Sequence, residues 1–182
     1  KPETVFNLQD MRDDVLAVCA QEKITRAIVM GVSVGSGIAM LMGLEQPAMC
    51  DAIVLVGGSS NGPRNVEAIV GPMKQETLGD YLMHLMRGYV APGFADTRHG
   101  KWLLSLFVED AKNLSARCIA QIFRARGSCD MTDRLPGMKV PTLVVNGAHD
   151  ESLARGGVTA GLIPGAKHAV IPNTGQIGRA HV

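Results

Sequence analysis

The sequence predicts an α/β protein: a parallel sheet of about four strands with flanking helices. Short apolar runs with β-branched residues recur along the chain, and stretches with helical periodicity separate them. This alternation is typical of parallel strands joined by crossover helices. Polar residues follow the apolar runs, at the ends of the expected strands where ligands bind in such sheets.

Length and composition favour a single globular domain over residues 1–182. Hydrophobic residues make up 46% of the chain and charged residues 19%, which is the balance of a folded protein. The net charge is +1, with no basic stripe and few aromatic residues, so we expect no nucleic-acid partner. No residues have the spacing of a zinc site, and we expect neither a metal nor a cofactor.

The cysteines and one uncharged stretch bear on the cellular location. The four cysteines are widely spaced, form no C-x-x-C pair and are interpreted as buried thiols of a reducing compartment, the cytoplasm. Residues 27–44 carry no charge and reach the length of a transmembrane helix. Their four glycines and two serines favour a strand, a turn and a helix instead, so no membrane segment is expected.

The first elements read as helix, strand, helix and strand. Residues 7–24 open with Asn7 as the expected N-cap, and apolar side chains then recur at helical spacing. Residues 26–30 are a short apolar run typical of a buried parallel strand. A second helix over residues 36–44 and a second buried strand over residues 51–58 follow.

Residues 60–135 change character, because four stretches carry helical periodicity and none reads as a strand. We expect a helical lid inserted between two strands. The segment is rich in methionine, with Met73, Met83 and Met86, and Trp102 adds a large apolar side chain. Two interpretations stay open: a helical layer that packs on itself, which is favoured, or a lid whose apolar underside lines a substrate pocket.

Strand signals resume in the last third of the chain. Residues 140–150 run apolar to a glycine and an acid, and residues 166–176 run apolar to Pro-Asn-Thr-Gly. The carboxyl ends of parallel strands meet at one edge of a sheet. We therefore expect four polar residues at that edge: Ser33, Ser59, Asp150 and Gln176.

Residues 31–35, Gly-Val-Ser-Val-Gly, match G-x-S-x-G between an expected strand and an expected helix. This turn is so tight that the residues two positions either side of the serine should be small. It exposes the serine hydroxyl beside a helix N-terminus, which favours developing negative charge. Other glycine-loop motifs do not fit: a P-loop is absent, and a dinucleotide fingerprint starting at Gly35 has Met40 at its sixth position.

With this motif in its context, the sequence resembles the α/β-hydrolase superfamily, particularly its small esterases, enol-lactonases and cofactor-free haloperoxidase-like members. The resemblance implies that Ser33 is the nucleophile and that Asp150, after the penultimate strand, is the acid. It also implies that the backbone N–H of Val34 is an oxyanion donor and that the substrate is a small ester or lactone. The resemblance covers three stretches: residues 7–35, 130–150 and 163–175.

The sequence departs from the family at the base. The family places a catalytic histidine in a Gly-His step after the last strand, and Gln176 fills that position here. An amide takes up no proton at neutral pH, so it cannot act as the general base. Loss of the base from such a triad lowers turnover by a factor on the order of 10⁶.

The other histidines are poor substitutes for that base. His168 falls near the opposite end of the last strand. His149 precedes Asp150, and in the family a histidine in this turn commonly has no catalytic role. His181 would reach the site only if the local loop differed from the family's. His84 and His99 fall in the expected lid and are interpreted as surface residues.

The family's pattern also begins earlier than this sequence. Four strands, and a His-Gly loop that provides a second oxyanion donor, would precede residue 7. We expect a fragment or degenerate copy of a hydrolase, or a sheet that other residues complete. One way to complete it is a homodimer that covers the exposed sheet edge.

Three functional hypotheses follow from these residues. The first is a serine hydrolase of small esters or lactones, impaired by Gln176. The second is a non-catalytic ligand-binding or interaction protein on the same scaffold. The third, perhydrolysis or oxygenation without a cofactor, ranks last because those reactions need the same histidine.

Overall fold

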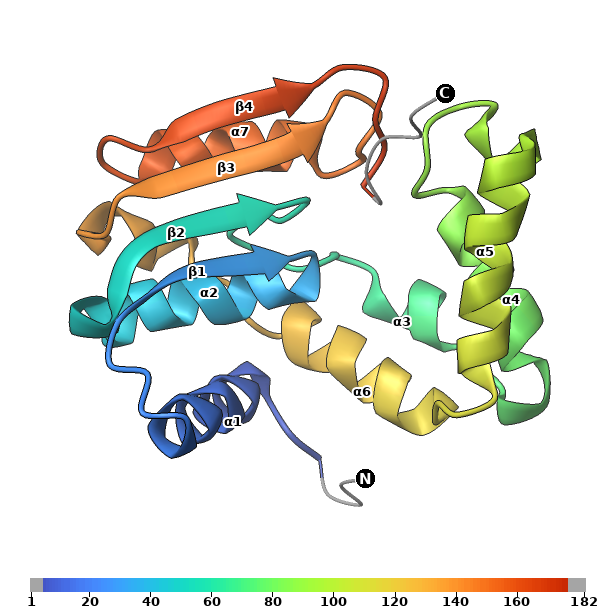
Figure 1. Cartoon of the computed structure of the whole chain (residues 1–182), viewed down its shortest axis with the longest axis horizontal. Coiled ribbons are helices and arrows are strands. Elements are labelled where there is room, and N and C mark those ends of the chain that lie inside the picture. The colour runs from blue at the N-terminus through green and yellow to red at the C-terminus, as the bar shows by residue number, and fades with distance from the viewer. Residues whose placement is uncertain (1–4, 177–182) are drawn as a thin grey trace.

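The computed structural model describes residues 5–176 and has a four-stranded parallel sheet at its centre (Figure 1). The strands lie in the order β1-β2-β3-β4, and each neighbouring pair is parallel. The predicted α/β fold with a parallel sheet of about four strands is confirmed. The strands are β1 (Ala27–Val32), β2 (Cys50–Val56), β3 (Thr142–Gly147) and β4 (Lys167–Ile171).

In the described part of the chain, a helix precedes β1 and further helices connect the strands. The α-helices are α1 (Leu8–Gln21), α2 (Val34–Glu45), α3 (Val66–Val70), α4 (Leu78–Arg87), α5 (Arg98–Ala111), α6 (Ala116–Gly127) and α7 (Leu153–Leu162). Short 3-10 helices span Pro47–Met49, Gln75–Thr77, Phe94–Asp96 and Thr132–Gly137. The pattern did not indicate α7, because its three glycines lower helix propensity.

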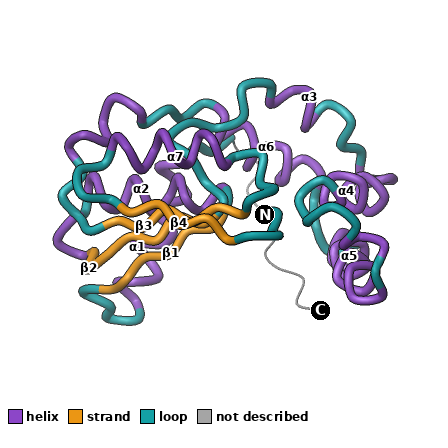
Figure 2. The backbone as a smooth tube through the Cα atoms, turned by 90° about the horizontal axis from the view of Figure 1, so that it is seen from above, coloured by secondary structure: helices purple, strands orange, loops and turns teal. Residues whose placement is uncertain are grey.

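One face of the sheet carries the main core. The side chains of Ile53, Leu55 and Val144 are fully buried and belong to one cluster with Met40 and Leu41 of α2. Helix α2 packs on β1 and β2, and α7 packs on β3 and β4. Both helices lie on the same side of the sheet, as Figure 2 shows. This packing fixes the starts of α2 and α7 at the carboxyl ends of β1 and β3.

The opposite face of the sheet is open at β1. Ile28, Met30 and Val32 are 68%, 66% and 53% exposed. Side chains two positions apart in a strand point to the same face of the sheet, so the three side chains of β1 share one face. The register pairs Met30 with Val54 and Val32 with Val56. Parallel sheets are normally covered on both faces. Within residues 5–176, nothing covers these three side chains of β1.

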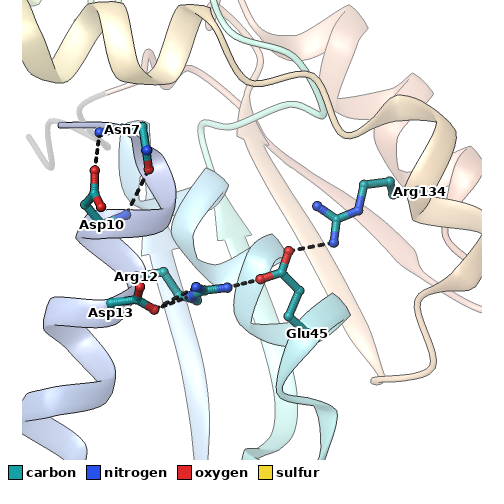
Figure 3. A network of polar contacts seen from close by, with 6 residues as sticks. All are labelled: Asn7, Asp10, Arg12, Asp13, Glu45 and Arg134. Atoms are coloured by element: carbon teal, nitrogen blue, oxygen red, sulfur yellow. Dashed lines mark hydrogen bonds and ion pairs between the residues drawn. The ribbon is translucent and has the colours of Figure 1, made fainter. Parts of the chain in front are cut away.

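A polar network fixes α1 against α2 (Figure 3). The N–H of Asp10 donates to Asn7 Oδ1 at 2.9 Å, and the N–H of Asn7 donates to the Asp10 carboxylate at 2.8 Å. Asn7 is thus the N-cap, as predicted. Arg12 of α1 forms an ion pair with Glu45 at the end of α2, and Arg134 contacts the same carboxylate at 2.6 Å. The network therefore joins α1, α2 and the chain segment before β3.

The helices predicted within residues 60–135 form, but they divide into two groups. Helices α4 and α5 pack on each other in a hairpin that stands to one side of the sheet (Figure 2). Their side chains form clusters separate from the main core, around Leu78 with Met73 packed against it, and around Phe94 and Leu104. Helix α6 instead packs on α1, α2 and α3. Met73 therefore follows the first interpretation, a helical layer that packs on itself.

The structure also describes the uncharged stretch of residues 27–44 and the four cysteines. No helix in the described part of the chain is long and apolar enough to cross a membrane, and residues 27–44 lie in β1, a turn and α2. All four cysteines are free thiols. Only Cys50 is buried, while Cys19, Cys118 and Cys129 are half-buried.

Candidate functional site

Ser33 lies on the sharp turn between β1 and α2. Its φ of 52° and ψ of −115° are unusual for a residue with a side chain, and its N–H donates to the Val56 carbonyl at 2.8 Å. A Cβ at Gly31 would lie 2.1 Å from the Gly35 carbonyl oxygen, so position 31 needs glycine. A Cβ at Gly35 would meet no atom within 4 Å. The sequence predicted that both positions 31 and 35 need a small residue. The contacts support this at Gly31 but not at Gly35.

Ser36 braces this turn from the first turn of α2. It is fully buried, and its Oγ donates to the Gly31 carbonyl at 2.9 Å and lies 3.3 Å from the Val56 carbonyl. A Cβ at Gly58 would lie 2.3 Å from the Ser36 side chain, so the end of β2 packs directly against it. Sequence reasoning missed Ser36. The available signal was a serine in the first turn of a helix that carries no other polar side chain before Glu45.

Gln176 lies against Ser33 although 143 positions separate them in the sequence. Its Nε2 donates to Ser33 Oγ at 2.9 Å and to the Gly57 carbonyl oxygen at 3.1 Å. The Gly57 carbonyl can only accept a hydrogen bond, so it holds the amide with its N–H groups toward Ser33. The amide therefore donates to the hydroxyl and does not accept from it.

Asp150 lies in a loop between β3 and α7 and is 5% exposed. The N–H of Ser152 donates to its Oδ1 at 2.7 Å, and Asn146 Nδ2 lies 3.3 Å from its Oδ2. A Cβ at Gly57 would lie 3.3 Å from Asp150 Oδ2 and 2.9 Å from Gln176 Cγ. The carboxylate and the amide therefore converge over Gly57, which has the positive φ of 58°. The structure brings Ser33, Gln176 and Asp150 together at the predicted edge.

A buried amide that sequence reasoning missed holds the Asp150 loop. Asn146, at the end of β3, is 1% exposed, and its Nδ2 also donates to Ser152 Oγ at 2.9 Å. Its Oδ1 lies 3.0 Å from His168 Nε2. A Cβ at Gly156 would lie 2.1 Å from Asn146 Oδ1, so a glycine of α7 makes room for this amide. The sequence signal was an amide inside an apolar strand.

The described histidines do not reach Ser33. None of them lines the cavity beside the serine, and all are exposed: His84, His99, His149 and His168. His168 is engaged with Asn146. His181 lies outside the described residues, so the expectation that it is a poor substitute for the base stays a prediction.

The helical segment contacts the loop that carries Gln176. A Cβ at Gly175 would lie 2.3 Å from the Tyr89 carbonyl oxygen and 2.7 Å from the Val90 carbonyl carbon. The chain just after α4 therefore packs directly on this loop. Burial, with the negative charge of Glu151 adding to it, raises the pKa of Tyr89 to about 12, so its phenol stays protonated at neutral pH.

A small cavity of about 60 Å³ opens beside Ser33. Val34, the first residue of α2, lines it, and the first N–H groups of a helix have no acceptor within the helix. The loop after β2 contributes Ser59, whose Oγ donates to the Asn61 carbonyl at 2.8 Å. The helical segment contributes the apolar and aromatic side chains of Pro63, Ile69, Tyr89 and Phe123, together with Arg126, but no methionine.

Comparison with known proteins is consistent with this geometry. The family model described as "serine aminopeptidase, S33" matches residues 3–160, where S33 is a family label and not a residue. No match was found among curated proteins.

Solved structures match over nearly the whole chain. The enol-lactonase from Burkholderia xenovorans LB400 is 19% identical with a TM-score of 0.85, and the match covers 97% of this chain and 68% of that one. The esterase from Exiguobacterium antarcticum is 23% identical with a TM-score of 0.83, covering 96% and 69%. An N-acyl homoserine lactone-degrading enzyme is 25% identical with a TM-score of 0.79, covering 97% and 70%. With the family match, these likenesses show that the chain belongs to the serine aminopeptidase S33 family of the α/β-hydrolase superfamily.

Proposed function

We propose that this chain carries the nucleophile site of a serine hydrolase for small esters or lactones. Ser33 is the nucleophile, Asp150 the acid, and the backbone N–H of Val34 an oxyanion donor. The observation that carries the proposal is the 2.9 Å contact between the strained Ser33 and the side chain at position 176. This contact joins a strand-to-helix turn to the loop after the last strand, with Asp150 close by.

The reaction needs a proton acceptor at position 176. Ser33 Oγ attacks the substrate carbonyl carbon, its proton passes to the base, and the carbonyl oxygen becomes an oxyanion facing the Val34 N–H. The base then returns the proton to the leaving alcohol, and water hydrolyses the acyl-enzyme by the same route. Gln176 presents an N–H to Ser33 and takes up no proton, so we propose that this chain turns over esters very slowly.

Esters and lactones fit the site better than peptides. The similar structures include an enol-lactonase and an esterase, although the family description names an aminopeptidase. An aminopeptidase must bind the α-ammonium group of its substrate, which calls for negative charge near the nucleophile. Arg126 and Arg155 line the cavity against one carboxylate, Glu151. This charge balance disfavours an ammonium group.

Covalent labelling with a fluorophosphonate probe tests the nucleophile. We expect the Gln176→His variant to be labelled at Ser33, located by peptide mass spectrometry, and the unaltered chain to react far more slowly. Gln46→His is the matched control, because it adds an imidazole at the other end of α2. Labelling of another residue, or labelling that survives Ser33→Ala, would contradict the proposal.

A non-catalytic role is the second candidate, and the Gln176 amide at the base position favours it. In that case the Ser33 hydroxyl would neither react with the ligand nor contribute to its binding. Ser33→Ala would then leave ligand affinity unchanged, and Gln176→His would produce no esterase activity. The labelling experiment and these two variants separate the candidates.

We also propose that the protein acts in the cytoplasm. The four cysteines form no disulfide, which supports a reducing compartment. Measuring the redox state of the thiols in freshly lysed cells of the source organism tests this. Disulfide-bonded cysteines would contradict it.

A further inference from the structure

The cavity beside Ser33 continues into a larger one. A second cavity of about 660 Å³ adjoins it, a volume typical of sites for small molecules. Residues that line both cavities join them: Asn61, Pro63, Ile69, Glu151 and Arg155. A substrate whose carbonyl group reaches Ser33 can therefore extend into the larger space.

Positive charge prevails in these joined cavities. Arg126 lines the small cavity, Arg64 the large one, and Arg155 both. Glu151 is the carboxylate that opposes them. The Tyr89 phenol is neutral at physiological pH because its pKa is about 12. The lining thus favours an anionic ligand.

Arg126 is a buried cation without a carboxylate partner in the described part of the chain. It is 4% exposed, and its guanidinium donates to the Ser59 carbonyl and, at 2.9 Å, to the Cys129 carbonyl. Burial lowers the pKa of Arg126 to about 10, which still leaves it charged at neutral pH. The exposed Asp130 carboxylate attracts Arg126 but forms no ion pair with it. A buried charge that carbonyl dipoles and one more distant carboxylate compensate still favours a counter-ion. Its bonds to two segments also give Arg126 a structural role.

Arg155 is the side chain best able to bind such an anion. It lies on α7, is half-buried and makes one long hydrogen bond, 3.3 Å from Nη1 to the Gly62 carbonyl. Across residues 5–176 it forms no ion pair, although Glu151 lies only four residues earlier, just before α7. A guanidinium presents a planar fork of donors that matches a carboxylate.

We propose that this site selects esters or lactones that carry a second group, a carboxylate, and that Arg155 is the specificity-determining residue. Arg126, which lines the small cavity beside Ser33, strengthens the positive potential there. The inference rests on the proposed function, because it takes Ser33 as the reacting atom. It goes further by naming the charge of the substrate.

A matched pair of substrates tests the inference in the Gln176→His variant. Mono-p-nitrophenyl succinate carries a terminal carboxylate, and p-nitrophenyl 4-methylpentanoate replaces that carboxylate with a neutral isopropyl group of similar shape. We expect a higher kcat/KM for the succinate ester. Arg155→Met should lower the ratio of the two kcat/KM values by about 10- to 100-fold, the usual effect of a charged hydrogen-bonding partner. Arg98→Met removes the same charge from an exposed position outside both cavities and should leave the ratio unchanged.

A ratio that Arg155→Met does not change would overturn the inference, even if both esters are hydrolysed. If Gln176→His hydrolyses neither ester, the proposed function fails and binding becomes the test. Calorimetry with monoethyl succinate and the unaltered chain should then show binding that Arg155→Met weakens at least tenfold and Arg98→Met does not. Equal affinity in all three proteins, or no binding to the unaltered chain, would overturn the inference on its own.

Discussion

The contact between Gln176 and Ser33 sets the chemistry at the scale of single residues. A serine hydroxyl must give up its proton to become a good nucleophile, and the amide offers it an N–H instead. The Gly57 carbonyl accepts the second N–H at 3.1 Å and so fixes the amide in this direction. The strained turn and the Asp150 carboxylate thus lie at the same edge of the sheet, while the side chain at position 176 accepts no proton.

Gly57 is the residue whose replacement should disturb this contact most directly. In Gly57→Ala, the new Cβ would lie 2.9 Å from Gln176 Cγ and 3.3 Å from Asp150 Oδ2, at a φ of 58°. We expect a loss of about 1–2 kcal/mol in the free energy of unfolding from the backbone alone, measured by urea denaturation. Gly161→Ala is the control, because its Cβ would meet no atom and it lies inside α7. Equal stability of the two variants would contradict this account of Gly57.

Tyr89 gives the site a pH dependence with a definite sign. Its pKa is raised to about 12, above the ordinary value of 10, so the folded state favours the neutral phenol. The neutral Tyr89 phenol therefore stabilises the folded state fully below pH 10, and this stabilisation is lost as the pH rises from about 10 toward 12. Phenolate absorbance should show both tyrosines ionising above pH 10 in the folded chain, because burial raises the pKa of Tyr81 as well. In Tyr89→Phe the later step should disappear, and ionisation of both tyrosines near pH 10 would refute the account.

Residues of the site differ in how well the sequence reveals them. Ser33, Asp150 and Gln176 were identified because a short motif and the order of strands place them together, and the structure brings them together. Asn146 and Gly57 were not identified, because their positions matter only through contacts with loops far away in the sequence. Local pattern carries no information on such contacts.

At the scale of elements, the start of α2 decides where Ser33 lies. Ser36 ties the first turn of this helix to the end of β1 through its 2.9 Å bond to the Gly31 carbonyl. Ser36→Ala would leave that buried carbonyl with one partner fewer and should cost about 1–3 kcal/mol of unfolding free energy. Ser105→Ala removes an exposed hydroxyl that bonds the Trp102 carbonyl, and should cost much less in the same denaturation assay. A smaller effect at Ser36 than at Ser105 would rule out this bracing role.

Elements were predictable where their own residues favour them. Each of the four strands was recognised as a short apolar run, and Asn7 marked the start of α1. Helix α7 was missed because Gly156 and Gly157 lower its helix propensity, and the fold needs Gly156 to admit Asn146. Tertiary packing therefore determined a helix that local preference opposes. The role of α4 and α5 as a lid stays a prediction.

At the scale of the whole molecule, the open face of the sheet is the most unusual feature. Ile28, Met30 and Val32 of β1 are more than half exposed, and β1 pairs on one side with β2. Apolar side chains exposed on an edge strand of this kind promote association. The homodimer expected from the sequence stays a prediction that this surface supports.

We therefore expect the 182-residue chain to self-associate. Light scattering after size-exclusion chromatography should give a mass well above the 19.3 kDa of one chain. Met30→Lys combined with Ile28→Lys should shift the mass toward the monomer, because the two charges lie on the open face. Val18→Lys alters an exposed apolar residue of α1 and should have little effect. A monomeric unaltered chain would exclude self-association through this face.

The central claim is that Ser33 is a nucleophile whose base position holds an amide. Its most direct test is the kcat/KM for p-nitrophenyl acetate in the unaltered chain, in Gln176→His and in Gln176→His with Ser33→Ala. The account predicts a gain of at least about 10²–10⁴-fold from the histidine, which is the usual contribution of general acid–base catalysis. A gain on the order of 10⁶ would correspond to a fully restored triad. The gain should rise with pH through the ordinary histidine pKa of about 6.5 and vanish when Ser33 is replaced. No gain in the single variant, or a gain that survives the loss of Ser33, would contradict the claim.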